Sequence, residues 1–314
     1  MERRCELDFL RGVAAFGIVG CHLLLSPRTG AGWMLTNLCD MNVGIFAALS
    51  GYLMAYGRWN GCGDYVRKRV ERILPVYVVW TVFYLLFSVC FQLCEGGAVS
   101  PRYGDFEWWV RVVFWGSSAT HLWFLASLFY AQIVGAVIFR RMPGLFWIGM
   151  SLVVILTSVC LNNWYVKYPI RLFSFLMLGY GLSSVEVMWL RRHRLFILIT
   201  AGLAVLAHFI PSPQQIGFVK DWVVVFPVLL AFVARPDCFT GRLAAVGSFL
   251  GVTSMGVYLI HPIFTKGIGL IVRRVFGAPY GFLPVIADWS VSWICAMAVT
   301  VVLLRFHKLA RFVR

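Results

Sequence analysis

Residues 73–93 read ILPVYVVWTVFYLLFSVCFQL, a stretch without a charged side chain that is long enough to cross a bilayer as one helix. Similar apolar runs recur along the whole chain of 314 residues, of which 61% are hydrophobic and 13% are charged. Soluble domains have about 45–50% apolar and about 25% charged residues. The composition therefore excludes an ordinary soluble enzyme, a disordered protein and a fibrous repeat.

Ten apolar runs, bounded by charged residues, proline or glycine, predict ten helices. Their expected spans are Leu7–Leu25, Met41–Tyr56, Ile73–Leu93, His121–Phe139, Leu145–Leu161, Ile170–Met188, Leu195–Ile210, Val219–Ala234, Val246–Phe264 and Leu283–Leu304. The aromatic segment Trp108–Trp115 is expected at the membrane interface, where tryptophan is enriched. We therefore expect an all-α, polytopic transmembrane bundle that forms one integral-membrane domain over residues 1–314.

The charge distribution predicts the orientation of this bundle. The formal net charge is +15, which in a soluble protein would indicate nucleic-acid binding. No basic segment stands clear of the apolar runs, so we do not expect nucleic acid as a partner. With the N-terminus inside, the inner helix ends hold about twice as many Lys and Arg residues as the outer ends. This excess predicts that both termini are cytoplasmic.

The first apolar run has two interpretations. Arg3 and Arg4 precede the run from Val13 to Leu25, as in a signal peptide. However, Asp8 and Arg11 lie directly before the run, and no cleavage site of small residues follows it. We therefore expect a retained first helix.

Three polar side chains lie on one stripe of this first helix. At about 100° per residue, Asp8, Arg11 and His22 project within about 40° of one another. Arg11 and His22 are about 16 Å apart along the axis, with Arg11 near the cytoplasmic end and His22 towards the outside. Ionisable residues inside an apolar span are functional candidates. Two structural alternatives stay open: an Asp8–Arg11 ion pair within the helix, and a core histidine bonded to a backbone carbonyl.

Further polar residues are predicted at the same outer level. His121 opens the fourth expected helix, His261 lies near the end of the ninth, and Asp40 and Asn42 open the second. These histidines and His22 would converge on an outer cavity, although each also fits an interfacial position. Of the three histidines, His22 is expected to lie furthest from a helix end.

A basic cluster, Arg67-Lys68-Arg69-Val70-Glu71-Arg72, directly precedes the apolar run at Ile73. The cluster fits a cytoplasmic membrane anchor, and charge alone favours this interpretation. It also fits a clamp for phosphate groups, because arginine donates bidentate hydrogen bonds to phosphate. If this segment is helical, Arg69 and Arg72 face the same way.

Several other motifs are absent from the sequence. It contains neither the phosphate-binding loop of an NTPase, nor HExxH, nor GxSxG. The nine cysteines show neither a CxxC pair nor a zinc spacing, so we expect no metal. The GxxxG of Gly247 and Gly251 predicts a close helix contact.

Five blocks, in order, resemble the membrane acyltransferase-3 family. They are Glu6–Ala15 continuing to His22, with an Arg, ten residues and a His; Val43–Leu53; Arg69-x-x-Arg72 before Pro75; His121–Leu125; and Tyr258–Pro262. Ala47 departs from the family, which often has a second aromatic residue after Phe46. The resemblance extends from the first expected helix to the ninth. It implies ten helices and transfer of an acyl group, usually acetyl, from cytoplasmic acyl-CoA to a hydroxyl of an extracytoplasmic carbohydrate.

The resemblance also implies residue roles and a bacterial cytoplasmic membrane as the location. His22 would act as general base, Arg11 would orient the donor, and Asp8 would hold Arg11. The remaining candidates are Lys68, Arg69 and Arg72 for the CoA phosphates, and Asn42, His121, Trp123, Tyr258 and His261 for the acceptor side.

Two alternatives stay open. One is transfer of another acyl group, such as succinyl. The other is a transporter of a sugar, lipid or proton in which the histidines form a relay. Transporters often show inverted halves, and the sequence shows no such symmetry.

Overall fold

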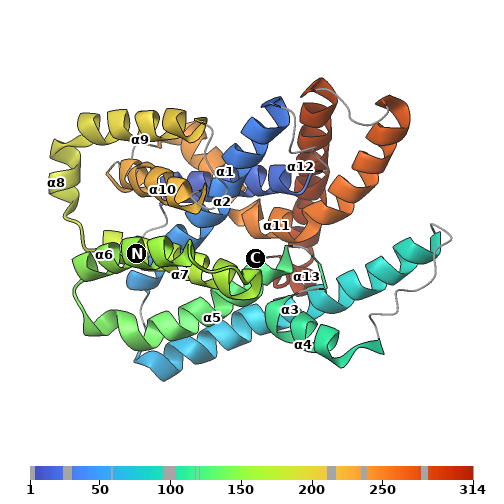
Figure 1. The fold of residues 1–314 in the computed structure, drawn as a ribbon, viewed down its shortest axis with the longest axis horizontal. Helices are drawn as coiled ribbons and strands as arrows, with labels where there is room; N and C mark the ends of the chain where they lie inside the picture. Colours follow the sequence, from blue (N-terminus) through green and yellow to red (C-terminus); the bar gives the residue numbers. More distant parts are fainter. Residues whose placement is uncertain are drawn as a thin grey trace. The chain divides into compact units, whose positions relative to one another are not determined.

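The computed structural model describes residues 4–23, 30–57, 59–94, 104–116, 118–119, 121–210, 217–234, 239–276 and 282–313, and every regular element within these ranges is helical (Figure 1). The all-α prediction is confirmed. Each of the ten predicted helices has a counterpart. They are α1 (Cys5–Cys21), α2 (Gly30–Ala55), α3 (Cys62–Cys94), α5 (Leu122–Ile138), α6 (Gly144–Ser158), α7 (Trp164–Leu182), α9 (Arg194–His208), α10 (Gly217–Val233), α11 (Gly241–Phe276) and α12 (Phe282–Arg305).

Shorter helices occur between and after these ten. They are α4 (Phe106–Trp115), α8 (Val187–Arg192), α13 (His307–Ala310) and the 3₁₀ turn η2 (Phe139–Arg141). α4 is the aromatic segment expected at the membrane interface. The carboxylate of Asp105 caps its N-terminus by accepting a hydrogen bond from the Glu107 backbone N–H, and Gly116 ends it with φ 66°. The interfacial position of α4 stays a prediction.

Within the described residues, five helices are long and apolar enough to cross a membrane. They are Leu38–Ala55, Cys62–Leu93, Leu122–Arg141, Gly241–Val272 and Leu283–Arg305. α6 and α9 are shorter apolar helices. Both the hydropathy and the helical content fit an integral membrane bundle, because only a helix satisfies all its backbone polar groups within one apolar segment.

Several predicted helix boundaries are wrong. α1 ends at Cys21 rather than Leu25, and α11 continues to Phe276 rather than ending at Phe264. α2 and α3 begin well before the predicted Met41 and Ile73. The predicted boundaries follow hydropathy, which reflects burial rather than backbone hydrogen bonding, so the first predicted helix is longer than α1. The third predicted helix is shorter than α3, because Lys and Arg are good helix formers but a boundary drawn by hydropathy excludes them.

The chain forms two compact units, residues 1–57 with 139–314, and residues 58–138. In the first unit, α1 packs along α2 and α11, α7 packs along α2 and α6, and α12 packs along α11. In the second unit, α3 and α4 both pack against α5. The prediction of a single domain stays a prediction.

Glycines allow α1 to approach its neighbours closely. A Cβ on either glycine of the Gly247–Gly251 motif would overlap α1, at the Cys5 carbonyl and at the Asp8 side chain. A Cβ on Gly17 of α1 would likewise overlap Asn42 of α2. The predicted close contact at the GxxxG motif is therefore confirmed, and it joins α11 to α1.

Candidate functional site

Two histidines meet at the end of α1 that the charge distribution predicts to be the outer one. His22 is the C-cap residue of α1, and its ring centroid lies 5.0 Å from that of His261 on α11, with the ring planes tilted by 42°. We call these two residues the histidine pair. The prediction that His22 lies furthest from a helix end is wrong, because α1 ends at Cys21 and His261 lies within α11.

The imidazole of His261 is fully buried and held by its own helix. Its Nδ1 lies 2.8 Å from the carbonyl oxygen of Tyr258 and 3.2 Å from that of Val257. Tyr258 thus contributes a backbone carbonyl to the site, and its own ring is buried with its centroid 6.3 Å from that of His261. Lys266, farther along α11, interacts electrostatically with His22. The site therefore combines two imidazoles with one nearby cation.

The inner half of α1 holds the other two predicted residues, Asp8 and Arg11, both half-buried. Asp8 packs against Gly251 of α11. The Asp8–Arg11 ion pair stays a prediction. Arg4, at the start of α1, donates hydrogen bonds to the Tyr52 hydroxyl at 3.1 Å and to the Phe232 carbonyl at 3.1 Å, which fixes this end of α1 to α2 and α10.

Asn42 lies within α2 rather than at its start, because this helix begins at Gly30. Its side chain is buried and its Nδ2 donates to the carbonyls of Leu38 at 2.8 Å and Cys39 at 3.0 Å. The same side chain covers Gly17 of α1. Asn42 therefore joins α2 to α1, and its role in acceptor binding stays a prediction.

The basic cluster lies in the second unit, in the first turns of α3 rather than before the helix. Asp64 accepts a hydrogen bond from Lys68 at 2.8 Å and a longer one from Arg67 at 3.4 Å. The guanidinium of Arg69 lies 4.9 Å from the centroid of the buried Tyr65 ring. Arg72 is exposed one turn further on. The two arginines of the R-x-x-R motif therefore share a face of α3, as the sequence predicts.

His121 and Trp123 also belong to the second unit. His121 is buried directly before α5, with its ring edge-to-face on Tyr84 of α3 at 4.8 Å between centroids. Trp123 is half-buried and contacts Phe124 edge-to-face. His121 thus joins α3 to α5, and its convergence with His22 stays a prediction.

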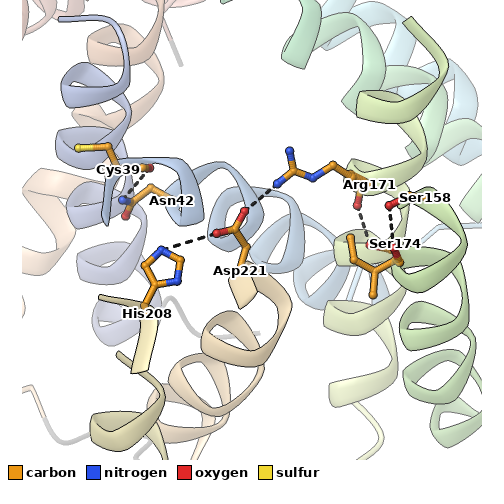
Figure 2. A network of polar contacts seen from close by, with 8 residues as sticks. Cys39, Asn42, Ser158, Arg171, Ser174, His208 and Asp221 are labelled. Atoms are coloured by element: carbon orange, nitrogen blue, oxygen red, sulfur yellow. Dashed lines mark hydrogen bonds and ion pairs between the residues drawn. The ribbon is translucent and has the colours of Figure 1, made fainter. Parts of the chain in front are cut away.

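The sequence interpretation missed a second buried polar group in the first unit. Arg171 on α7 donates to Asp221 on α10 at 2.7 Å, and His208 at the end of α9 has its Nε2 3.8 Å from the other Asp221 oxygen (Figure 2). The Arg171 and Asp221 side chains are only 11% and 6% exposed. We call Arg171, His208 and Asp221 the ionic cluster. It joins α7, α9 and α10.

The ionic cluster lies near the end of α1 that carries His22. Asp40 of α2 interacts electrostatically with Arg171, with His208 and with Cys21, the residue before His22. The sequence did contain a signal for this cluster. Asp221 and Arg171 are charged residues inside predicted apolar spans, and such charges are functional candidates in any helix of a bundle, as Asp8 and Arg11 are in the first.

The comparisons with known proteins agree with the resemblance in the sequence. Neither curated proteins nor solved structures gave a match. The family described as an acyltransferase domain matches residues 6–304, which include both histidines of the pair, both arginines of the R-x-x-R motif and the whole ionic cluster. The chain therefore belongs to the acyltransferase-3 family of transferases.

Proposed function

We propose that this protein is a membrane O-acyltransferase with His22 as its general base. It moves an acyl group, most simply acetyl, from cytoplasmic acyl-CoA to a hydroxyl of an extracytoplasmic carbohydrate or glycoconjugate. The acceptor reaches the site from the outer face of a plasma membrane. The observation that carries this proposal is the histidine pair at the end of α1, with ring centroids 5.0 Å apart.

The chemistry needs one base and one acid, and a single imidazole can serve as both. His22 takes the proton of the acceptor hydroxyl while the hydroxyl oxygen bonds to the thioester carbon. The carbon–sulfur bond then breaks, and the departing CoA thiolate takes the proton from His22. The step therefore consumes one hydroxyl and one thioester, and releases one ester and one thiol.

The donor end of the site is assigned to arginines. Arg69 and Arg72 share a face of α3 and, with Lys68, supply positive charge for the CoA phosphates. Arg11, on the inner half of α1, orients the donor, and Asp8 holds Arg11. The acceptor side is assigned to Asn42, His121, Trp123, Tyr258 and His261.

The first test is binding of acetyl-CoA to the detergent-purified protein, measured by calorimetry. We expect saturable binding that weakens about tenfold or more in Arg11→Ala and in the double variant Arg69→Ala, Arg72→Ala, because a hydrogen bond to a charged group is worth about 1.5–3 kcal/mol. The matched control is Arg191→Ala, Arg192→Ala, which removes two exposed arginines of α8. It should leave the affinity unchanged.

The same calorimetric measurement distinguishes acetyl transfer from transfer of another acyl group and from transport. Binding of succinyl-CoA without binding of acetyl-CoA would assign a different acyl donor. If the folded protein binds neither, the donor assignment is wrong, and a transporter with a histidine relay becomes the better explanation. Equal weakening by the α8 control would show that only net charge matters.

A further inference from the structure

We propose that His261 is a positioning residue that sets the tautomer of His22, and that Pro262 makes this possible. The catalytic consequence rests on the proposed role of His22 as general base. The tautomers themselves do not depend on that role. They follow from the backbone of α11, the two bonds to the ring of His261, and the contact within the histidine pair.

The first step is the proline inside α11. The helix continues from Gly241 to Phe276 with Pro262 in its interior. Proline has no backbone N–H, so the carbonyl of the residue four positions earlier, Tyr258, receives no hydrogen bond from it. In an apolar setting a carbonyl without a donor is costly, so another donor is favoured there.

The second step is the bond that replaces it. Nδ1 of His261 lies 2.8 Å from this carbonyl oxygen, and the neighbouring Val257 carbonyl is 3.2 Å away. A carbonyl only accepts hydrogen bonds, so Nδ1 must carry the hydrogen. In the neutral ring the lone pair is then on Nε2, at the tip of the side chain.

The third step is the contact with His22. The centroids are 5.0 Å apart and the ring planes are tilted by 42°, so a rotation of the His22 ring can bring one of its N–H groups to the buried Nε2 of His261. Nε2 of His261 can then accept from a ring N–H of His22. This bond would leave the lone pair of His22 on its other nitrogen, ready to take the proton of the acceptor hydroxyl.

In this arrangement the neutral imidazole of His261 holds the proposed base, His22. A base is most effective when a second group fixes the tautomer and the direction of its ring. When His22 becomes protonated, both of its nitrogens carry hydrogens. One of them stays bonded to His261, and the other is returned to the CoA thiolate.

The test is ¹⁵N NMR of the full-length protein in detergent, labelled at its six histidines. Single substitutions assign the signals. In the wild type we expect His261 with hydrogen on Nδ1 and none on Nε2, and His22 as a single tautomer. In His261→Phe, the signals of His22 should become those of a mixture of tautomers. His261→Gln, whose side-chain oxygen can accept a hydrogen bond, should restore the single tautomer.

Two controls separate positioning from structure. His208→Phe removes another buried histidine and should leave the His22 signals unchanged. If His261→Phe does not fold, Pro262→Ala replaces it, because the new N–H competes for the Tyr258 carbonyl and should give His261 a second tautomer. Pro227→Ala, at the proline inside α10, is the matched control for that change and should leave the spectrum as it is.

Hydrogen on Nε2 of wild-type His261, or unchanged His22 signals in the folded His261→Phe protein, would overturn the proposal. In an assay of acetyl transfer, His261→Phe should lower kcat by up to about 10²-fold with the KM for acetyl-CoA unchanged, and His261→Gln should recover part of that loss. A protein that shows these tautomers but transfers no acyl group would contradict only the proposed function.

Discussion

The histidine pair and the ionic cluster both contain buried polar side chains and lie in the same unit, but their partners differ in kind. In the ionic cluster the charges of Arg171 and Asp221 compensate each other at 2.7 Å. In the histidine pair the ring of His261 is bonded to neutral backbone carbonyls. A buried charge beside its counter-charge is largely committed to that partner. An imidazole held by carbonyls through one nitrogen has a second nitrogen that can accept a hydrogen bond from a neighbouring base.

His208 and His261 make the same contrast within one residue type. Both are buried, at 4% and 0% exposure. His208 faces a carboxylate at 3.8 Å, whereas His261 faces another imidazole. Burial of an ionisable group in an apolar bundle therefore identifies a candidate functional residue. The chemical nature of its partner then indicates whether its role is structural or catalytic.

The largest expected effect is that of His22→Ala on transfer. We expect kcat to fall by about 10²–10⁴-fold, because general-base catalysis contributes that much. The measurement is incorporation of label from [¹⁴C]acetyl-CoA into membrane-associated carbohydrate, normalised to folded protein. His193→Ala, in the turn between α8 and α9, is the control and should retain full activity. If His22→Ala retained more than a tenth of the wild-type rate, His22 would not be the general base. The histidine pair would then have no catalytic role to distinguish it from the ionic cluster.

The next effect is on stability and concerns the ionic cluster. Asp221→Ala leaves the buried guanidinium of Arg171 without its counter-charge, so the free energy of unfolding should fall by about 3–5 kcal/mol. Unfolding in detergent, by heat or by added denaturing detergent, gives this value.

A second variant tests the explanation. Arg171→Met with Asp221→Leu removes both charges and should restore most of the lost stability, because similarly sized apolar residues often replace a buried pair without loss. If the double variant unfolds as readily as Asp221→Ala while the wild type stays stable, the pair is not simply a link between α7 and α10.

The sequence was sufficient for the helices because their signal is local. Each apolar run reports the same physical demand, that a backbone in hydrocarbon be helical. The ends were less predictable, since α1 stops at Cys21 although Leu23–Leu25 continue the apolar run. The Gly247–Gly251 motif predicted a close contact but not that its partner is α1, because spacing does not name the opposite helix.

The candidate site was predictable only in part, for a related reason. His22 and His261 stood out as polar residues in apolar runs, whereas their contact depends on the packing of α1 against α11. The tautomer of His261 depends on one bond to the Tyr258 carbonyl, which no residue pattern specifies. Arg171 and Asp221 are 50 positions apart, so their pairing follows from the packing of α7 and α10 rather than from spacing.

The smallest expected effect separates the two buried histidines directly. His208→Gln keeps a polar group near Asp221 but removes the imidazole, and at 3.8 Å the wild-type contact is long for a hydrogen bond. We therefore expect the free energy of unfolding to fall by no more than about 0.5 kcal/mol, the lower end of the usual net contribution of one hydrogen bond, and kcat to stay unchanged once folded protein is counted. The experiment pairs His208→Gln with His261→Phe in the same transfer and unfolding assays. A fall in kcat for His208→Gln as large as that for His261→Phe would mean that the ionic cluster takes part in the reaction, and that a charged partner does not exclude a chemical role in this bundle.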